Sequence, residues 1–112
     1  MAQYLISFPD GAMDFPAEDL SDVEKASLAV VEEARKAGVW VFGAGVLGHD
    51  VSLVGTDGSV SAATYPGTER HLGGFSVIDV ATREEALDWA ARIAASCRCA
   101  QEVRELMPDP EM

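Results

Sequence analysis

HLGGFSVIDVATREEALDWAARI, residues 71–93, decides the fold because it joins a strand directly to a helix. After the glycine pair, residues 74–80 carry apolar side chains on both faces, which is typical of a central strand. Thr82 and Glu85 then have the spacing of a capping box, in which each side chain satisfies a free backbone N–H of the other. A helix is therefore expected to start at Thr82.

Two helices are expected, and each has one apolar face. The first starts at Ser21, where Ser21 and Glu24 again have capping-box spacing, and it ends before Gly38, a residue suited to a helix C-terminus. Its apolar stripe comprises Leu20, Val23, Ser27, Val30, Ala34 and Ala37. The apolar face of the second helix comprises Ala86, Trp89, Ala90 and Ile93.

Further strands are expected on either side of the helices, over residues 2–8, 39–46 and 97–106. Two shorter strands, 51–54 and 59–63, flank Asp57-Gly58, a dipeptide that readily adopts the positive φ of a hairpin turn. Gly43 and Gly45 lie near the end of one strand and permit a bulge or a close approach of another backbone.

The resulting order, β-α-β-(β-hairpin)-β-α-β, predicts an α+β domain of the ferredoxin-like class. The 112 residues fit one domain, over residues 1–107, followed by a polar tail over 108–112. Two helices can cover only one face of the sheet, and apolar residues occur on both faces. We therefore expect a homodimer in which two sheets face each other as a barrel-like sandwich.

The charge of the chain limits its partners. Nineteen acidic residues against eight lysines and arginines give a net charge of −11. Binding to nucleic-acid phosphates needs clustered cations, and anionic membranes also attract basic segments. We therefore expect neither nucleic acid nor a membrane as a partner.

Acidic residues are concentrated between residues 10 and 24, where no basic residue occurs: Asp10, Asp14, Glu18, Asp19, Asp22 and Glu24. A solvated loop and helix start would explain them, because acids are favoured near a helix N-terminus. The alternatives are a weak cation site and an acidic surface that docks a partner.

The N-terminal residues lack the basic segment and the long apolar run of a secretory signal. We therefore expect a cytoplasmic protein whose two cysteines, Cys97 and Cys99, are reduced. On a strand, residues two apart share a face but aim in parallel, so a disulfide between them is disfavoured.

No cofactor and no metal are expected. A metal site needs about four ligands, and the chain has only two histidines and two cysteines. Gly43-x-Gly45 is half of a phosphate-binding fingerprint, but it ends a strand without opening a helix, so a dinucleotide site is excluded.

The chain resembles the YCII-related family, and more closely its DGPF-type branch, along nearly its whole length. The resemblance rests on ARKAGVWVFGAGVL (34–47), HLGGFSVIDV (71–80), REEALDWAARI (83–93) and EVREL (102–106). It implies a ferredoxin-like fold and a dimeric α+β barrel. Most members have no assigned reaction, although a few relatives act on small aromatic or lactone substrates.

Two departures from the family pattern bear on catalysis. The branch is named for an Asp-Gly-Pro-Phe tetrad, and its place is taken here by Ala62-Ala63-Thr64-Tyr65, which keeps only the aromatic ring. Some relatives are thought to use a His-Asp pair with the histidine in the first helix, and residues 21–37 contain no histidine. Neither acid–base group can be carried over to this chain.

His71 is the candidate catalytic residue, since an imidazole with a pKa near about 6.5 can move protons at neutral pH. Tyr65 and Arg70 are candidate ligand-binding residues, the tyrosine orienting a ligand and the arginine holding an anionic group. His49 and Asp50 are further candidates, although adjacent side chains usually diverge. A solvated turn is the simpler interpretation of each histidine, because catalysis would also need a carboxylate to orient the ring.

Three functions remain open at this point. The first is a small-molecule-binding or accessory dimer without catalysis, which the loss of the tetrad's aspartate favours. The second is a small dimeric enzyme, isomerase-like or lyase-like, that uses His71 for proton transfer on a small aromatic or lactone substrate. The third is an interaction domain that docks a partner through its acidic segment.

Overall fold

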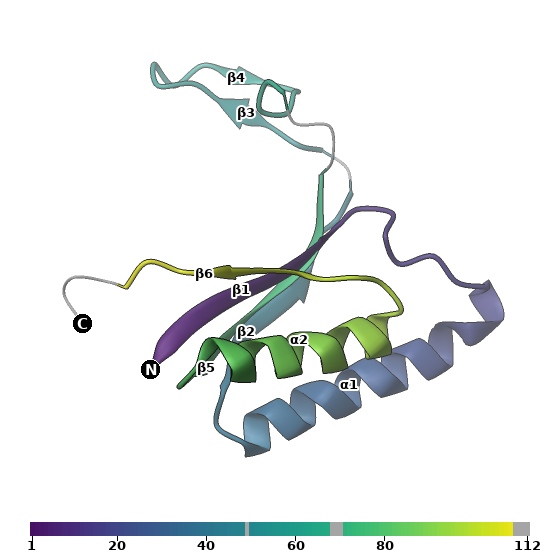
Figure 1. Ribbon diagram of the computed structural model, residues 1–112. Coiled ribbons are helices and arrows are strands. Elements are labelled where there is room, and N and C mark those ends of the chain that lie inside the picture. Colours follow the sequence, from purple (N-terminus) through teal and green to yellow (C-terminus); the bar gives the residue numbers. More distant parts are fainter. Residues whose placement is uncertain (49, 68–70, 109–112) are drawn as a thin grey trace.

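The computed structural model describes residues 1–48, 50–67 and 71–108. Its main sheet has four strands in the order β2-β5-β1-β6, with every neighbouring pair antiparallel, and two helices cover one face of it (Figure 1). The strands are β1 (Ala2–Pro9), β2 (Trp40–Gly45), β5 (Leu72–Val80) and β6 (Glu102–Glu105), and the helices are α1 (Leu20–Lys36) and α2 (Arg83–Cys97). The predicted ferredoxin-like α+β class is confirmed.

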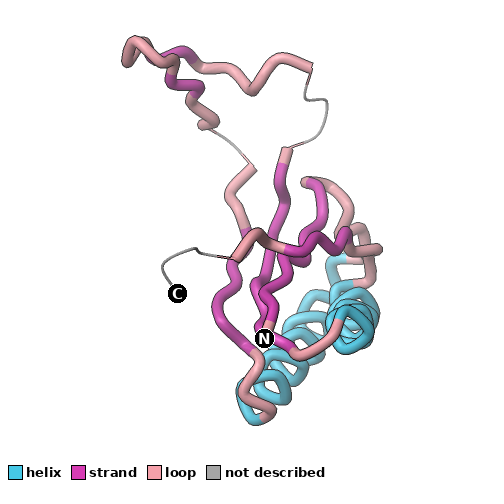
Figure 2. Tube along the Cα trace, turned by 60° about the vertical axis from the view of Figure 1, so that its left-hand side comes forward, coloured by secondary structure: helices cyan, strands magenta, loops and turns pink. Residues whose placement is uncertain are grey.

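A second sheet of two strands stands apart from the first. β3 (Leu53–Val54) pairs with β4 (Val60–Ser61), and this hairpin projects beyond the ends of β2 and β5 (Figures 1 and 2). Gly58 has a φ of 86°, as the predicted turn requires. The backbone N–H of Ser59 donates to the Asp57 carboxylate at 2.9 Å, which holds the pKa of that carboxyl below its usual value. Residues 46–48 and 50–67 are termed the arm.

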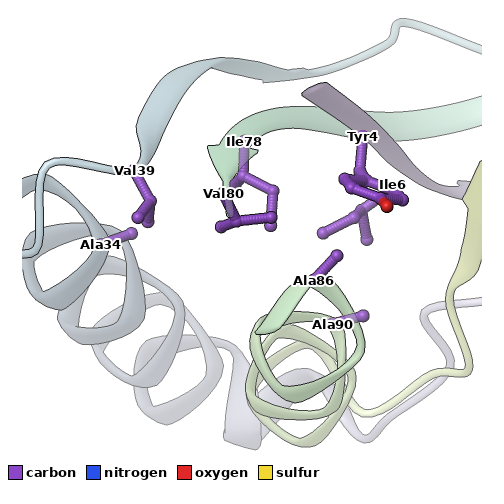
Figure 3. Packing of buried hydrophobic residues seen from close by; sticks show 8 residues of the cluster. All are labelled: Tyr4, Ile6, Ala34, Val39, Ile78, Val80, Ala86 and Ala90. Atoms are coloured by element: carbon purple, nitrogen blue, oxygen red, sulfur yellow. The ribbon is translucent and has the colours of Figure 1, made fainter. Parts of the chain in front are cut away.

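The core lies between the main sheet and the two helices. Its buried apolar side chains form one cluster: Tyr4, Ile6, Ala34, Val39, Ile78, Val80, Ala86 and Ala90 (Figure 3). Both helices contribute alanines to this cluster, and small side chains allow a helix to lie close to a sheet. The larger side chains come from the strands, so the sheet supplies most of the buried apolar volume.

The glycine pair near the start of β5, Gly73-Gly74, is explained by two close approaches. A Cβ on Gly73 would lie 2.8 Å from the carbonyl carbon and oxygen of Pro9, and a Cβ on Gly74 would lie 2.6 Å from the ring of Phe8. The register of β1 against β5 shifts between Phe8 and Pro9, at the same point. The glycines therefore let the first residues of β5 pack directly against the end of β1.

The two predicted helix caps have different outcomes. The Thr82 hydroxyl accepts a hydrogen bond from the backbone N–H of Glu85 at 3.1 Å, so the start of α2 is confirmed. The cap at Ser21 is wrong, because a 3-10 turn, η1 (Ala17–Asp19), leads directly into α1 at Leu20. Asp19 is the N-cap residue and its side chain forms no capping hydrogen bond. Gly38 follows α1 with a φ of 75°, as expected.

The predicted strand over residues 97–106 is wrong in its first half. Cys97 is the last residue of α2, and Arg98 follows it in the left-handed region with a φ of 58°. The backbone N–H groups of Arg98 and Cys99 both donate to the carbonyl oxygen of Ala94, so these residues close the helix. The other strand predictions differ from the structure only at their ends.

We predict that Gly73→Ala lowers the free energy of unfolding by about 1–3 kcal/mol, the usual cost of forcing extra atoms into a packed region. The added methyl group would meet backbone atoms of Pro9, which cannot rotate away as a side chain can. Gly45→Ala is the matched control, since a Cβ there has no neighbour within 4 Å. Urea denaturation measures both variants, and equal stabilities would contradict the prediction.

Candidate ligand-binding site

A hollow at the base of the arm brings together two of the residues predicted from the sequence. It has a volume of about 440 Å³, and both Tyr65 and His71 line it. The rest of its lining is mainly apolar and comprises Val46, Leu47, Gly48, Val51, Ser52, Leu53, Ala63, Thr64 and Leu72. This hollow is termed the base cavity.

His71 is held in place through its backbone. Its carbonyl oxygen accepts a hydrogen bond from the backbone N–H of Asp10 at 2.7 Å. Its side chain is exposed, and none of the hydrogen bonds found among the described residues involves the imidazole. Both ring nitrogens are therefore open to a ligand.

Asp10 is a carboxylate at this site that the sequence pattern predicted only as part of the acidic segment over residues 10–24. A Cβ on Gly48 would lie 2.8 Å from Oδ2 of Asp10, so the carboxylate lies against a residue that lines the base cavity. The feature of the sequence that could have indicated this role is the position of Asp10 just beyond the predicted strand over residues 2–8. Since β1 and β5 run antiparallel, the residue after β1 comes to lie beside the residue before β5.

The other predicted site residues do not join Tyr65 and His71 in the described structure. Asp50 is exposed, adopts a φ of 60°, and is not among the residues that line the base cavity. His49, Glu69 and Arg70 lie outside the described residues.

A second cavity, of about 370 Å³, lies between the helices and the sheet and is termed the helix–sheet cavity. Its apolar lining includes Phe8, Val30, Trp40 and Ile93, and its polar lining includes Ser27, Ser96, Cys97 and Gln101. Gly43 leaves room for the Trp40 indole, since a Cβ there would lie 2.6 Å from the ring. The sequence pattern did not predict this cavity, because Cys97 was expected on a strand and is instead the last residue of α2.

The two cysteines occupy different surroundings at the end of α2, and both are free thiols. The Cys97 sulfur lies 3.8 Å from the Ser27 hydroxyl of α1 and 3.9 Å from the Ser96 hydroxyl. Burial raises the pKa of the Cys99 thiol, and the nearby Cys97 adds to the increase. The Gln101 amide donates to the Cys99 sulfur at 3.4 Å, which opposes that increase in part.

The acidic segment between residues 10 and 24 is partly engaged within the chain. Asp19 forms an ion pair with Arg98 at 2.7 Å, and the Arg98 guanidinium lies 6.0 Å from the centre of the Phe15 ring. Within residues 1–48, 50–67 and 71–108, no three His, Cys, Asp or Glu side chains are grouped so that they could hold a metal ion. In the same ranges, none of the helices combines the length and apolar character needed to cross a membrane.

A four-stranded antiparallel sheet with both helices on one face defines an α+β protein of the ferredoxin-like class. Within that class the chain belongs to the YCII-related domain family, whose profile matches residues 3–108. Among solved structures it is similar to 5-chloro-2-hydroxyhydroquinone dehydrochlorinase (TftG) from Burkholderia phenoliruptrix AC1100, in complex with 2,5-dihydroxybenzoquinone. The TM-score is 0.57 over 97% of each chain, and the sequence identity of 15% limits this similarity to the fold. A search of curated proteins gave no match.

We predict that alkylation of Cys99 has a higher pH midpoint in the folded protein than in urea, because a raised pKa lowers the reactive thiolate fraction. Trypsin cleaves after Arg98, so mass spectrometry follows the two cysteines in separate peptides. Gln101→Ala should raise the midpoint further, since the variant lacks the donor to the Cys99 sulfur. Identical midpoints in folded and unfolded protein would refute this.

Proposed function

We propose that this protein is a homodimer that binds a small, mainly apolar molecule in the base cavity. The observation that carries the proposal is the convergence of Tyr65 and His71 on one largely apolar hollow. Its volume of about 440 Å³ lies within the usual range of ligand pockets, about 300–1,000 Å³. Such pockets combine an apolar lining with a few polar groups that orient the ligand.

The polar groups have distinct roles in this proposal. The Tyr65 hydroxyl donates or accepts one hydrogen bond, and the His71 imidazole does the same at either nitrogen. Arg70, next to His71 in the sequence, holds an anionic group of the ligand. His49 and Asp50 are kept as ligand-binding candidates on the sequence alone, and Asp50 is not among the residues that line the base cavity.

The assignment to the DGPF-type branch is part of the same proposal. Ala63, Thr64 and Tyr65 occupy three of the four positions of the branch's tetrad, and all three line the base cavity. Ala62 takes the place of the tetrad's aspartate, so the acid is lost while the hollow is kept. This combination favours binding over catalysis. TftG, which shares the fold, is a dehydrochlorinase in complex with a small ring compound.

The alternative function is isomerase-like or lyase-like proton transfer by His71. It is favoured by the Asp10 carboxylate, which lies against Gly48 of the base cavity. A catalytic imidazole is normally held by a hydrogen bond to its orienting group. Among the described contacts no such bond joins Asp10 to the ring, so binding is the better-supported function.

The homodimer is supported by the amount of surface that a single chain exposes. The exposed area is 7839 Å², about 1,900 Å² more than the roughly 5,900 Å² expected for a compact monomer of 11.9 kDa. Part of this surface is the face of the sheet that the helices leave uncovered. Packing against a second copy would remove it from water.

The uncovered face is apolar at its centre. Leu5 and Phe42 are both paired with Val77, so the three side chains point to the same face. The Phe42 ring is more than half exposed, and its centre lies 5.8 Å from that of Phe75. Asp79 lies on the same face, and its Oδ1 is buried without a hydrogen-bond partner among the described residues. A donor from a second copy would offset that cost.

For the ligand, we predict that the wild type binds 2,5-dihydroxybenzoquinone without converting it. Tyr65→Phe and His71→Gln should each weaken binding about three- to tenfold, as expected for one lost hydrogen bond. Isothermal titration calorimetry measures the affinities.

Ser27→Ala and Cys97→Ser are the controls, because they change the helix–sheet cavity and should leave the affinity unchanged. Loss of binding confined to these two variants would place the ligand in that cavity and refute the proposed site. Turnover that His71→Gln abolishes would instead support the enzymatic alternative.

For the dimer, we predict a mass of twice 11.9 kDa at micromolar concentration by sedimentation equilibrium. Phe42→Lys should shift the protein toward the monomer, because it places a charge in the apolar sheet interface. Leu28→Lys, on the outer surface of α1, should not. A wild type that sediments as a monomer would refute the homodimer.

A further inference from the structure

We infer that the arm of each protomer docks on a second copy of this chain, and that the second copy closes the base cavity. The inference rests on the homodimer proposed above. It specifies a surface beyond the uncovered sheet face, and it makes the ligand site incomplete in a single chain.

Among the described residues, the two strands of the arm pair only with each other. β3 and β4 are only two residues long each, and they pair with each other rather than with the main sheet. An isolated two-stranded hairpin is at best marginally stable in water. The radius of gyration is 15.8 Å, against about 13 Å for a compact domain of this length, as the projecting arm in Figure 1 illustrates. The hairpin therefore needs contacts with a further protein surface to be stable.

The composition of the arm fits contact with a second copy. Val54 and Val60 lie directly opposite each other and are 62% and 68% exposed. The only charged side chains in the described part of the arm are Asp50 and Asp57. Protein interfaces are depleted of charge at their centres.

The main sheet has a modest footprint for a stable dimer. Four strands spaced about 4.8 Å apart and roughly 20 Å long have a flat area, without the relief of their side chains, of about 400 Å² per protomer, or about 800 Å² for the pair. Stable interfaces bury about 1,200–2,000 Å² in total. The arm continues directly from this sheet, since the Val46 N–H donates to the Gly73 carbonyl oxygen at 2.9 Å. Contacts of the arm with the second copy would supply the missing area.

The base cavity is also open to water in a single chain. Leu47 and Tyr65 line it, yet they are 76% and 74% exposed in a single chain. Binding sites usually enclose about 70–90% of the surface of a small ligand. A ligand held beside these two residues would remain in contact with water. A second copy that packs on the arm would cover them and exclude water from the imidazole of His71.

The test removes the apolar surface of the arm while keeping the hairpin. In the double variant Val54→Glu, Val60→Lys, the two new charges are directly opposite and attract each other across the strands. The dimer dissociation constant from sedimentation equilibrium should rise at least about tenfold. Modification of His71 by diethyl pyrocarbonate, followed by mass spectrometry, should become at least about tenfold faster because the second copy no longer shields the ring.

Leu28→Lys is the matched control, because Leu28 is 63% exposed on α1 and far from the arm in sequence. It should change neither the dissociation constant nor the rate of modification. Val54→Thr, a change of similar shape, should weaken the dimer in the same direction by about two- to threefold, and circular dichroism confirms that each variant is folded.

Two results would overturn the inference in different ways. If the wild type is a monomer, the homodimer fails and the arm contact fails with it. If the wild type is a dimer whose dissociation constant and His71 reactivity are unchanged in the double variant, or are changed equally by Leu28→Lys, the arm contact is wrong and the homodimer stands.

Discussion

The antiparallel pairing of β1 with β5 positions the core, the base cavity and the arm. These two central strands carry Ile6 and Ile78, which are completely buried against the helices. Where β1 ends, Gly73 allows the first residues of β5 to approach the backbone of Pro9. The same approach brings Asp10 beside His71 and sets the point at which the arm leaves the sheet. The positions of the core, the base cavity and the arm therefore all depend on the way β1 pairs with β5.

The helices cover only one face of the sheet, and this is the basis of both the proposed dimer and the proposed arm contact. Alanines let α1 and α2 lie close to one face, while Phe42 and Val77 remain on the other. A chain of this size has too few elements to cover both faces itself. The arm adds further apolar surface, and in the proposed dimer a second copy would cover the sheet and the arm at the same time by symmetry. The proposed ligand site would then be completed by both protomers.

Local patterns predicted much of the fold and part of the site. The alternation over residues 74–80, the Thr82 cap and the Asp57-Gly58 turn depend on neighbours within a few residues, and the structure contains all three. The predicted helix cap at Ser21 is wrong because Pro16 precedes a 3-10 turn that leads into α1 at Leu20, one residue earlier. The predicted C-terminal strand exists as β6, but its predicted start at Cys97 is wrong because α2 continues to that residue and ends with Arg98 in a left-handed conformation, without a glycine. Helix ends of this kind depend on competing hydrogen bonds that spacing alone does not reveal.

The ferredoxin-like order of elements follows from local patterns, because hydrophobic periodicity and turn residues act over short stretches of chain. His71 and Tyr65 were also predicted as candidates from their chemistry and their place before β5. The folded chain was needed to show that these two side chains line the base cavity and that Asp10 lies at its edge. The fold also shows that Cys97 ends α2 and lines the helix–sheet cavity, whereas the sequence pattern predicted it on a strand. The physical reason is that such juxtapositions arise from strand register and from the packing of distant segments, which no local pattern encodes.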